Sequence, residues 1–140
     1  MKKLLALLFC LALLPAGCAV PAKNGVLDAG GAQQLKLRQI QTRYFETDNK
    51  QKCMEAVLAT FQDLGFVIDK ASLDLGTVTA TKLSGYQLRM TVSVIPRGGR
   101  HMTVRASAQY QMYPVEDPRP YQQFFEALSK SMFLQAHLEE

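Results

Sequence analysis

Cys18 is the residue whose position in the chain most clearly suggests covalent chemistry. It follows Ala16 and Gly17, two small residues that offer a protease an extended chain with almost no side-chain bulk. Cysteine provides a soft nucleophilic sulfur that can carry a stable thioether. The pattern therefore indicates a processing site next to a modifiable thiol.

Residues 1–17 have the layout of a secretory signal peptide. Lys2 and Lys3 supply the basic start, and the run from Leu4 to Leu14 is apolar throughout. Signal peptides carry an apolar core of about 7–15 residues, whereas a membrane-spanning helix needs about 20. Pro15 ends any helix that forms, because its ring removes an interior hydrogen bond. The sequence therefore predicts export and removal of this segment.

The letters AGC after a leucine-rich stretch resemble the lipobox of bacterial lipoproteins. That pattern is commonly Leu, then Ala or Ser, then Gly or Ala, then Cys; here Pro15 stands where Leu is commonest, and Leu14 is one step further back. The resemblance implies a diacylglyceryl group on the Cys18 thiol, cleavage just before it, and acylation of the new amino group. Three acyl chains would hold the protein in a membrane far more firmly than a single chain does.

Two other interpretations of this segment remain open. An ordinary signal peptidase could cut after Ala22, since Val20 and Ala22 are small, and release a soluble protein. Alternatively, Cys18 is an incidental residue of an uncleaved segment. The residue after the cysteine is Ala19 and not Asp. In the enteric lipoproteins that this segment resembles, an Asp at this position favours retention at the inner membrane, so the resemblance implies the outer membrane.

The composition of the mature chain argues against a nucleic-acid partner. Removing residues 1–17 takes away Lys2 and Lys3 and lowers the formal charge from +4 to +2. A nucleic-acid binder is expected to keep a concentrated basic face. The remaining chain is long enough for one hydrophobic core but not for two.

Cys53 is the one cysteine left to the folded body, because Cys10 leaves with the signal and Cys18 would be lipidated. A single thiol makes no internal disulfide. Cys53 lies in a predicted helix beside an apolar stripe, so we interpret it as a small buried side chain. A reactive or intermolecular thiol is the alternative.

The other reactive side chains do not form a recognisable catalytic or metal motif. His101 and His137 are not part of an HExxH pattern, and Asp69 and Asp74 lack the spacing of a calcium loop. We therefore predict neither a catalytic residue nor a metal ligand nor a cofactor.

The glycine pair at 98–99 lies between Arg97 and Arg100. Its backbone donors could cradle an anion. The simpler interpretation is that the glycines allow the turn and that the arginines keep its tip soluble.

The pattern of elements predicts an α+β fold. Residues 19–34 read as a flexible tether and residues 35–45 as a strand. A helix follows, with Asp48 as its N-cap, Gln51 in a capping-box position and Gly65 at its end. Its apolar stripe is Met54, Val57, Leu58, Phe61 and Leu64.

The second half of the chain predicts four strands and a helix. Short strands are expected at residues 66–70 and 77–82, and strict alternation at 86–95 and 101–113 indicates a hairpin joined by a five-residue loop, PRGGR. Asp117 and Pro118 begin a final helix. Its apolar face is Tyr121, Phe124, Phe125, Leu128 and Met132. The order β-α-β-β-β-β-α describes a mostly antiparallel sheet of about five strands with two helices on one face, in a single domain at residues 35–140.

Period-two alternation leaves one face of this sheet polar. Its residues are Gln87, Arg89, Thr91 and Ser93 on one strand and Thr103, Arg105, Ser107 and Gln109 on the next. RNA-recognition sheets place stacking aromatics on such a face, and here we expect none. The face is either simply solvated or a docking surface for a protein, for peptidoglycan or for lipid headgroups, with Arg89, Arg105, Thr91 and Gln87 as the predicted contact residues.

The body of the chain also resembles known proteins in three blocks: RQIQTRYFETDN, FQDLGFVIDKASLDLGTVTATK and YQQFFEALSKSMFL. They are similar to a group of uncharacterised proteobacterial outer-membrane lipoproteins, which implies no particular activity. The element order is similar to the helix-grip modules of the lipoprotein C subunit of the outer-membrane β-barrel assembly machinery, and a shared fold does not imply a shared function.

We therefore expect a lipid-anchored envelope protein that acts as a non-catalytic protein-binding or assembly module on the periplasmic face of the outer membrane. The open sheet face or an exposed sheet edge would make the contact. The alternatives are a soluble periplasmic ligand-binding protein and an enzyme whose groups converge only in three dimensions.

Overall fold

The computed structural model describes residues 25–84 and 87–138. The chain divides into two compact units, residues 1–30 and 31–140. Of the first unit, only residues 25–30 are described, and they begin helix α2 (Gly25–Gln41). Cys18, the predicted signal peptide and the first part of the predicted tether lie outside the described residues.

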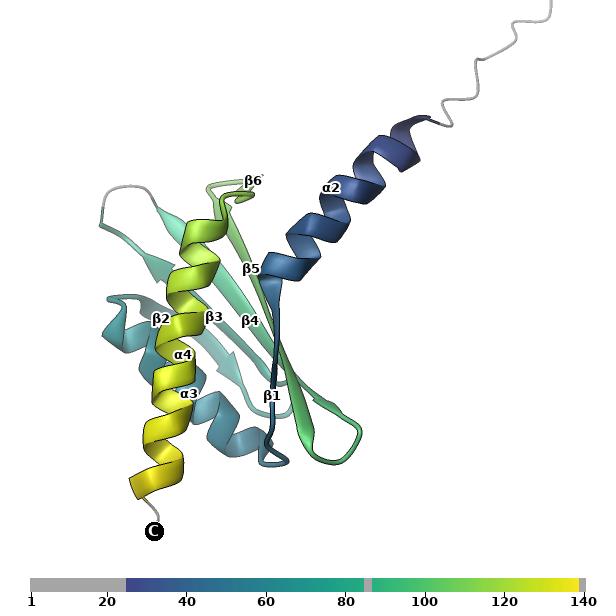
Figure 1. Ribbon diagram of the computed structural model, residues 1–140. Coiled ribbons are helices and arrows are strands. Elements are labelled where there is room, and N and C mark those ends of the chain that lie inside the picture. The colour runs from purple at the N-terminus through teal and green to yellow at the C-terminus, as the bar shows by residue number, and fades with distance from the viewer. Residues whose placement is uncertain (1–24, 85–86, 139–140) are drawn as a thin grey trace, which may run out of the picture. The chain divides into compact units, whose positions relative to one another are not determined.

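The second unit is an antiparallel sheet with helices packed against it, which confirms the predicted α+β class (Figure 1). The sheet order is β1-β5-β4-β3-β2, and β6 also pairs with β5. Helix α3 packs along α4 and contacts β2, β3 and β4. The elements after α2 are β1 (Thr42–Phe45), α3 (Lys50–Asp63), β2 (Val67–Ser72), β3 (Thr77–Lys82), β4 (Leu88–Arg97), β5 (His101–Tyr110), β6 (Tyr113–Pro114) and α4 (Pro118–Leu138).

The alternation in β4 and β5 gives the sheet a buried inner face and a polar outer face, as predicted. The inner face is buried beneath the helices and consists of Leu88, Met90, Val92, Val94, Met102, Val104, Ala106 and Ala108. The connecting loop is shorter than predicted, because Arg97 still pairs with His101. Gly98 and Gly99 both have positive φ, so three residues suffice to turn the chain.

Helix α3 starts one residue later than predicted. Asn49, not Asp48, is the N-cap, and its side chain accepts a hydrogen bond from the backbone N–H of Lys52. Gln51 donates to the Glu55 carboxylate instead of closing a capping box. Asn and Asp are equally good caps, so position relative to the core decides between them.

Gly65 ends α3 as predicted. Its φ of 76° places it in the left-handed region, and its N–H and that of Phe66 donate to the carbonyls of Gln62 and Phe61. The rings of Phe61 and Phe66 lie 5.2 Å apart. This contact closes the helix end over the core.

The predicted tether and first strand are wrong over most of their length, because residues 25–41 are helical and only Thr42–Phe45 form a strand. Leu, Lys, Arg and Gln are good helix formers. Leu37 and Ile40 are three residues apart, which is a helical spacing, and both are half-buried. In the sequence alone this spacing resembles the imperfect alternation of a strand. Gly30 and Gly31 weaken a helix only by about 1 kcal/mol each.

One edge of β5 is shared by two short strands. β1 pairs with residues 102–105 and β6 with residues 109–110. Between them, the buried Tyr121 hydroxyl of α4 accepts a hydrogen bond from Ala108 N at 3.2 Å and donates to Val115 O at 2.7 Å. Gln41 Nε2 at the end of α2 also donates to this oxygen, at 3.2 Å. The hydroxyl therefore uses its one proton and both acceptor positions.

Replacing Tyr121 with Phe is expected to lower the free energy of unfolding by about 1–3 kcal/mol. The change leaves the buried N–H of Ala108 without its partner while keeping the ring. Urea denaturation measures the effect, and Tyr113→Phe is the matched control, because the Tyr113 side chain is 73% exposed. Equal stability of both variants would contradict a structural role for the hydroxyl.

Candidate functional site

The outer face of the sheet is the candidate site, and it gathers all four predicted contact residues. Gln87 and Arg89 are exposed on or just before β4, Thr91 is half-buried on β4, and Arg105 is exposed on β5. The pairing Arg105↔Ser93 places both strands' polar residues on one surface. Helices α3 and α4 pack against the opposite face.

Arg89 is already engaged by an acidic neighbour. Its Nε lies 4.0 Å from Asp69 Oδ2, with the two side chains 51% and 39% exposed. Thr81 donates a hydrogen bond of 2.6 Å to the same carboxylate oxygen. Asp69 sits where the β2–β3 register shifts, between Ile68 and Lys70. At this shift the Asp69 carboxylate faces Thr81 and Arg89. Asp69 therefore links neighbouring strands of the sheet and is not part of a calcium loop.

Arg105 has a different environment from Arg89. It pairs in register with Thr42 and Ser93, and no ion pair reaches it within residues 25–84 and 87–138. Arg89 stands opposite Gln109. The two arginines are thus four positions apart along the sheet, about 13 Å. They share a face without forming one binding point.

A row of threonines stiffens the middle of the outer face. The hydroxyls of Thr79 and Thr91 lie 3.1 Å apart across β3 and β4 and share a hydrogen bond. β-branched side chains have few rotamers on a sheet. Thr91 is therefore a fixed part of the surface.

Sequence reasoning missed an apolar part of the outer face. Tyr44 of β1 opposes Thr103, and Ile95 opposes the same threonine from β4, with Tyr44 62% and Ile95 49% exposed. The Arg97 guanidinium lies 5.8 Å from the Tyr44 ring centroid. The face therefore carries an aromatic side chain, contrary to prediction. The position of Ile95 on this face could have been predicted, because Ile95 continues the alternation of β4. The position of Tyr44 could not, because β1 is far from β5 in the sequence.

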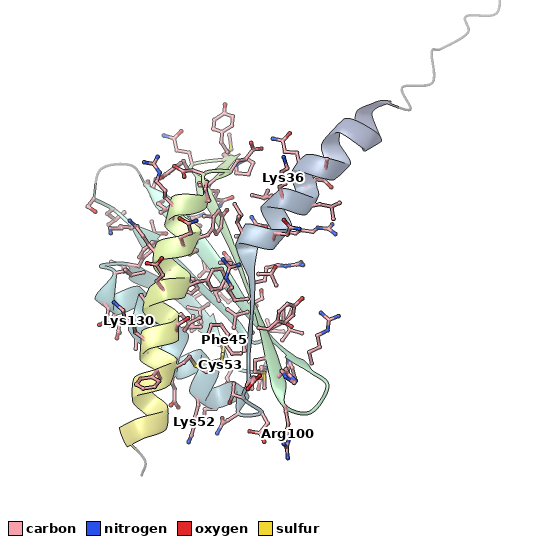
Figure 2. The ribbon with its side chains drawn as sticks, in the orientation of Figure 1. Lys36, Phe45, Lys52, Cys53, Arg100 and Lys130 are labelled. Atoms are coloured by element: carbon pink, nitrogen blue, oxygen red, sulfur yellow. The ribbon has the colours of Figure 1, made fainter. Side chains whose placement is uncertain are left out.

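Cys53 is buried between α3 and the rest of the core (Figure 2). Burial raises the pKa of its thiol to about 11. A protonated, buried thiol is a poor nucleophile. The geometry therefore supports the interpretation of Cys53 as a small core side chain.

Thiol reagents should label Cys53 at least about 100-fold more slowly in the native chain than after denaturation at pH 8, because little thiolate forms. A background of Cys10→Ser and Cys18→Ser isolates this one thiol, and mass spectrometry follows the label. The raised pKa also predicts that stability falls as pH rises from about 9 toward 11. Native labelling as fast as in urea would contradict the buried position.

The remaining reactive residues are scattered. His101 starts β5 and lies near Glu46, Asp48 and Arg100, while His137 belongs to α4, with its side chain outside the described part. Among the described residues, no three His, Cys, Asp or Glu side chains are grouped so that they could hold a metal ion. Asp74 contributes only its carbonyl, to Lys50 Nζ.

The glycine loop at 98–99 turns the β4–β5 hairpin. Arg100 N donates to the Gly98 carbonyl, and Arg97 is stacked beside Tyr44. One flanking arginine is therefore held on the outer face, away from a shared anion position.

Neither a comparison with protein-family models nor a search of curated proteins finds a match to this chain. Among the described residues, no helix has the length and apolar character needed to cross a membrane.

Proposed function

We propose that this chain is a lipid-anchored lipoprotein of the bacterial envelope whose α+β domain is a non-catalytic protein-binding or assembly module. The acyl chains on Cys18 would hold it on the periplasmic side of the outer membrane. The outer face, with Arg89, Arg105, Thr91 and Gln87, would contact a protein partner.

The anchor part of the proposal is supported by the sequence. A basic start, an apolar run that is short for a membrane span, and the small residues before Cys18 belong together in lipoprotein signals. Ala19 supports the outer membrane as the destination.

The binding part is supported chiefly by one observation, the exposed Arg105, which no ion pair among the described residues neutralises. Arg and Tyr are the residue types most enriched where protein partners make their strongest contacts. Tyr44 and Ile95 add apolar area next to this charge. That mixture favours a protein partner over peptidoglycan or lipid headgroups.

Lipid attachment is tested by the intact mass of the mature protein. The proposal predicts a chain that begins at Cys18 and is heavier by a diacylglyceryl group and one further acyl chain. Cys18→Ser should block this processing and leave the precursor, since serine offers no thiolate for the thioether. A mature chain that starts at Lys23 without lipid would contradict the anchor.

Charge changes on the outer face should weaken co-purification of envelope partners after crosslinking in living cells. Arg105→Glu should reduce recovery about tenfold, and Arg89→Glu less, because Asp69 already neutralises part of the Arg89 charge. Arg38→Glu on α2 is the matched control and should leave recovery unchanged. Recovery of every partner at the wild-type level by Arg105→Glu would rule out this surface.

A further inference from the structure

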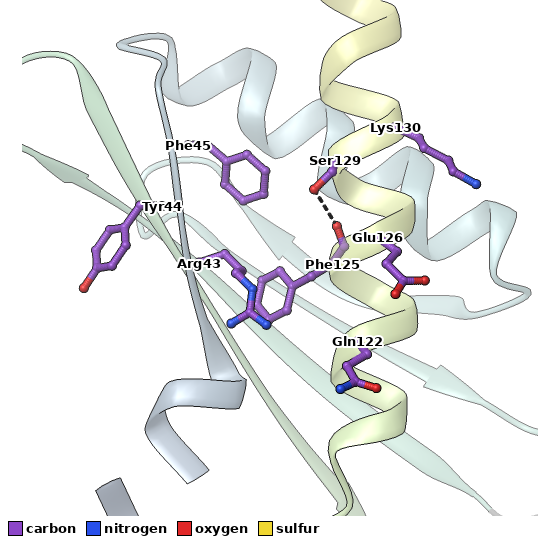
Figure 3. Close-up of a pocket in the computed structure, with 8 residues that line it drawn as sticks. All are labelled: Arg43, Tyr44, Phe45, Gln122, Phe125, Glu126, Ser129 and Lys130. Atoms are coloured by element: carbon purple, nitrogen blue, oxygen red, sulfur yellow. Dashed lines mark hydrogen bonds between the residues drawn. The ribbon is translucent and has the colours of Figure 1, made fainter. Parts of the chain in front are cut away.

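A hollow of about 480 Å³ lies between strand β1 and helix α4 (Figure 3). β1 contributes Arg43, Tyr44 and Phe45 to its lining, and α4 contributes Gln122, Phe125, Glu126, Ser129 and Lys130. Its volume falls in the range of about 300–1,000 Å³ that ligand pockets occupy. The Tyr44 side chain points to the opposite side of β1 from Arg43 and Phe45 in Figure 3.

β1 is an edge strand, and its edge is regular. Residues 42–45 pair with β5 in unbroken register, and among the residues that the structure describes no strand pairs with the other side of β1. The opposite edge strand, β2, is interrupted by a register shift beside Asp69 and carries Lys70 there. Bulges and lysines are common means of keeping an edge from pairing. Of the two edges, β1 is the one without a register shift, and the carbonyls of Thr42 and Phe45 on it already accept hydrogen bonds from Arg43 Nη1 and Thr47 N.

Arg43 brings a positive charge to this edge. Its guanidinium lies 5.1 Å from the Phe125 ring centroid, and its Nη1 donates to the carbonyls of Gln39 and Thr42 at 2.9 and 2.8 Å. These contacts hold the plane of the group in place. Within the described residues no carboxylate pairs with it, so Nε and Nη2 remain for a ligand.

The α4 side of the hollow is lined by Phe125 and by four polar side chains, Gln122, Glu126, Ser129 and Lys130. Ser129 uses its hydroxyl on the Phe125 carbonyl, at 2.8 Å. Glu126 and Lys130 project away from β1 in Figure 3. Glu126 and Lys130 line the α4 side of the hollow, so Arg43 is the charge that β1 itself presents to an occupant.

We propose that this groove binds an extended peptide segment of a partner protein, which adds a strand to β1 and places a carboxylate side chain on Arg43. Only a strand offers donors and acceptors at the spacing of a sheet edge. A planar guanidinium binds a carboxylate through two parallel hydrogen bonds. Four residues of β1 span about 13 Å, enough for two side chains of the peptide to face the hollow.

The proposal is tested with the purified full chain in a mild detergent and three fluorescent blocked peptides. The first alternates threonine and valine around a central glutamate, the second has lysine in place of the glutamate, and the third is the glutamate peptide with alternate backbone nitrogens methylated. Fluorescence anisotropy should show the glutamate peptide binding at least about tenfold more tightly than either of the others, because a charge-assisted hydrogen bond and strand pairing are both needed.

Arg43→Gln should abolish the preference for glutamate over lysine, whereas Arg105→Gln on the outer face should leave it within about twofold. Arg43→Lys keeps the positive charge but cannot make two parallel hydrogen bonds to a carboxylate, so it should give an intermediate preference. Urea denaturation of each variant confirms that the fold is kept.

Three results would overturn the proposal. They are equal binding of the glutamate and lysine peptides, undiminished binding of the methylated peptide, and a preference that survives Arg43→Gln. Dimerisation of the full chain that the glutamate peptide fails to displace would assign the edge to a second copy instead. Because Arg105 and Cys18 are not involved, failure here leaves the proposed outer-face function untouched.

Discussion

The arrangement of this domain depends on how β5 is satisfied along its other edge, which β1 and β6 cover only in part. A buried backbone N–H without a partner costs about as much as a lost hydrogen bond, and β5 has such a group at Ala108, between the stretches that β1 and β6 cover. The Tyr121 hydroxyl satisfies it. Because Tyr121 lies in the first turns of α4, the same bond fixes where that helix crosses the sheet.

Two further elements are tied to the same oxygen. The carbonyl of Val115, just before α4, accepts a hydrogen bond from the Tyr121 hydroxyl. The side chain of Gln41, the last residue of α2, donates a hydrogen bond to the same hydroxyl oxygen. The segment between β6 and α4 and the start of β1 are therefore positioned by one side chain. Once α4 is fixed, three aromatic rings meet in the core. The ring centroid of Phe61 lies 5.2 Å from that of Phe66 and 5.2 Å from that of Phe124.

This construction has consequences for both candidate surfaces. β1 is short because α2 ends next to Tyr121, and its short, regular edge faces α4 across the hollow that Arg43 and Phe125 line. On the other side, β1 brings Tyr44 next to Arg105 and Thr103 on the outer face. The two sides of this four-residue strand thus belong to two different surfaces, the hollow beside α4 and the open outer face of the sheet.

The sequence by itself determined the elements whose signal is local. Strict alternation in β4 and β5 requires one buried face, Gly65 permits the left-handed end of α3, and Asp117 caps α4 by accepting from Arg119 N. The four predicted outer-face residues followed from the same alternation. The signal segment and Cys18 are read from local pattern as well, and their function stays a prediction.

Only the tertiary structure decided the rest. Residues 35–41 contain too few apolar positions to distinguish a helix from a strand, and the contact of Gln41 with Tyr121, 80 residues away, selects the helix end. The partnership of Arg89 with Asp69, the presence of Tyr44 on the outer face and the stacking of Arg43 on Phe125 all join distant strands and helices. Such contacts depend on strand order, and strand order is set by the packing of the whole core rather than by any short stretch of sequence.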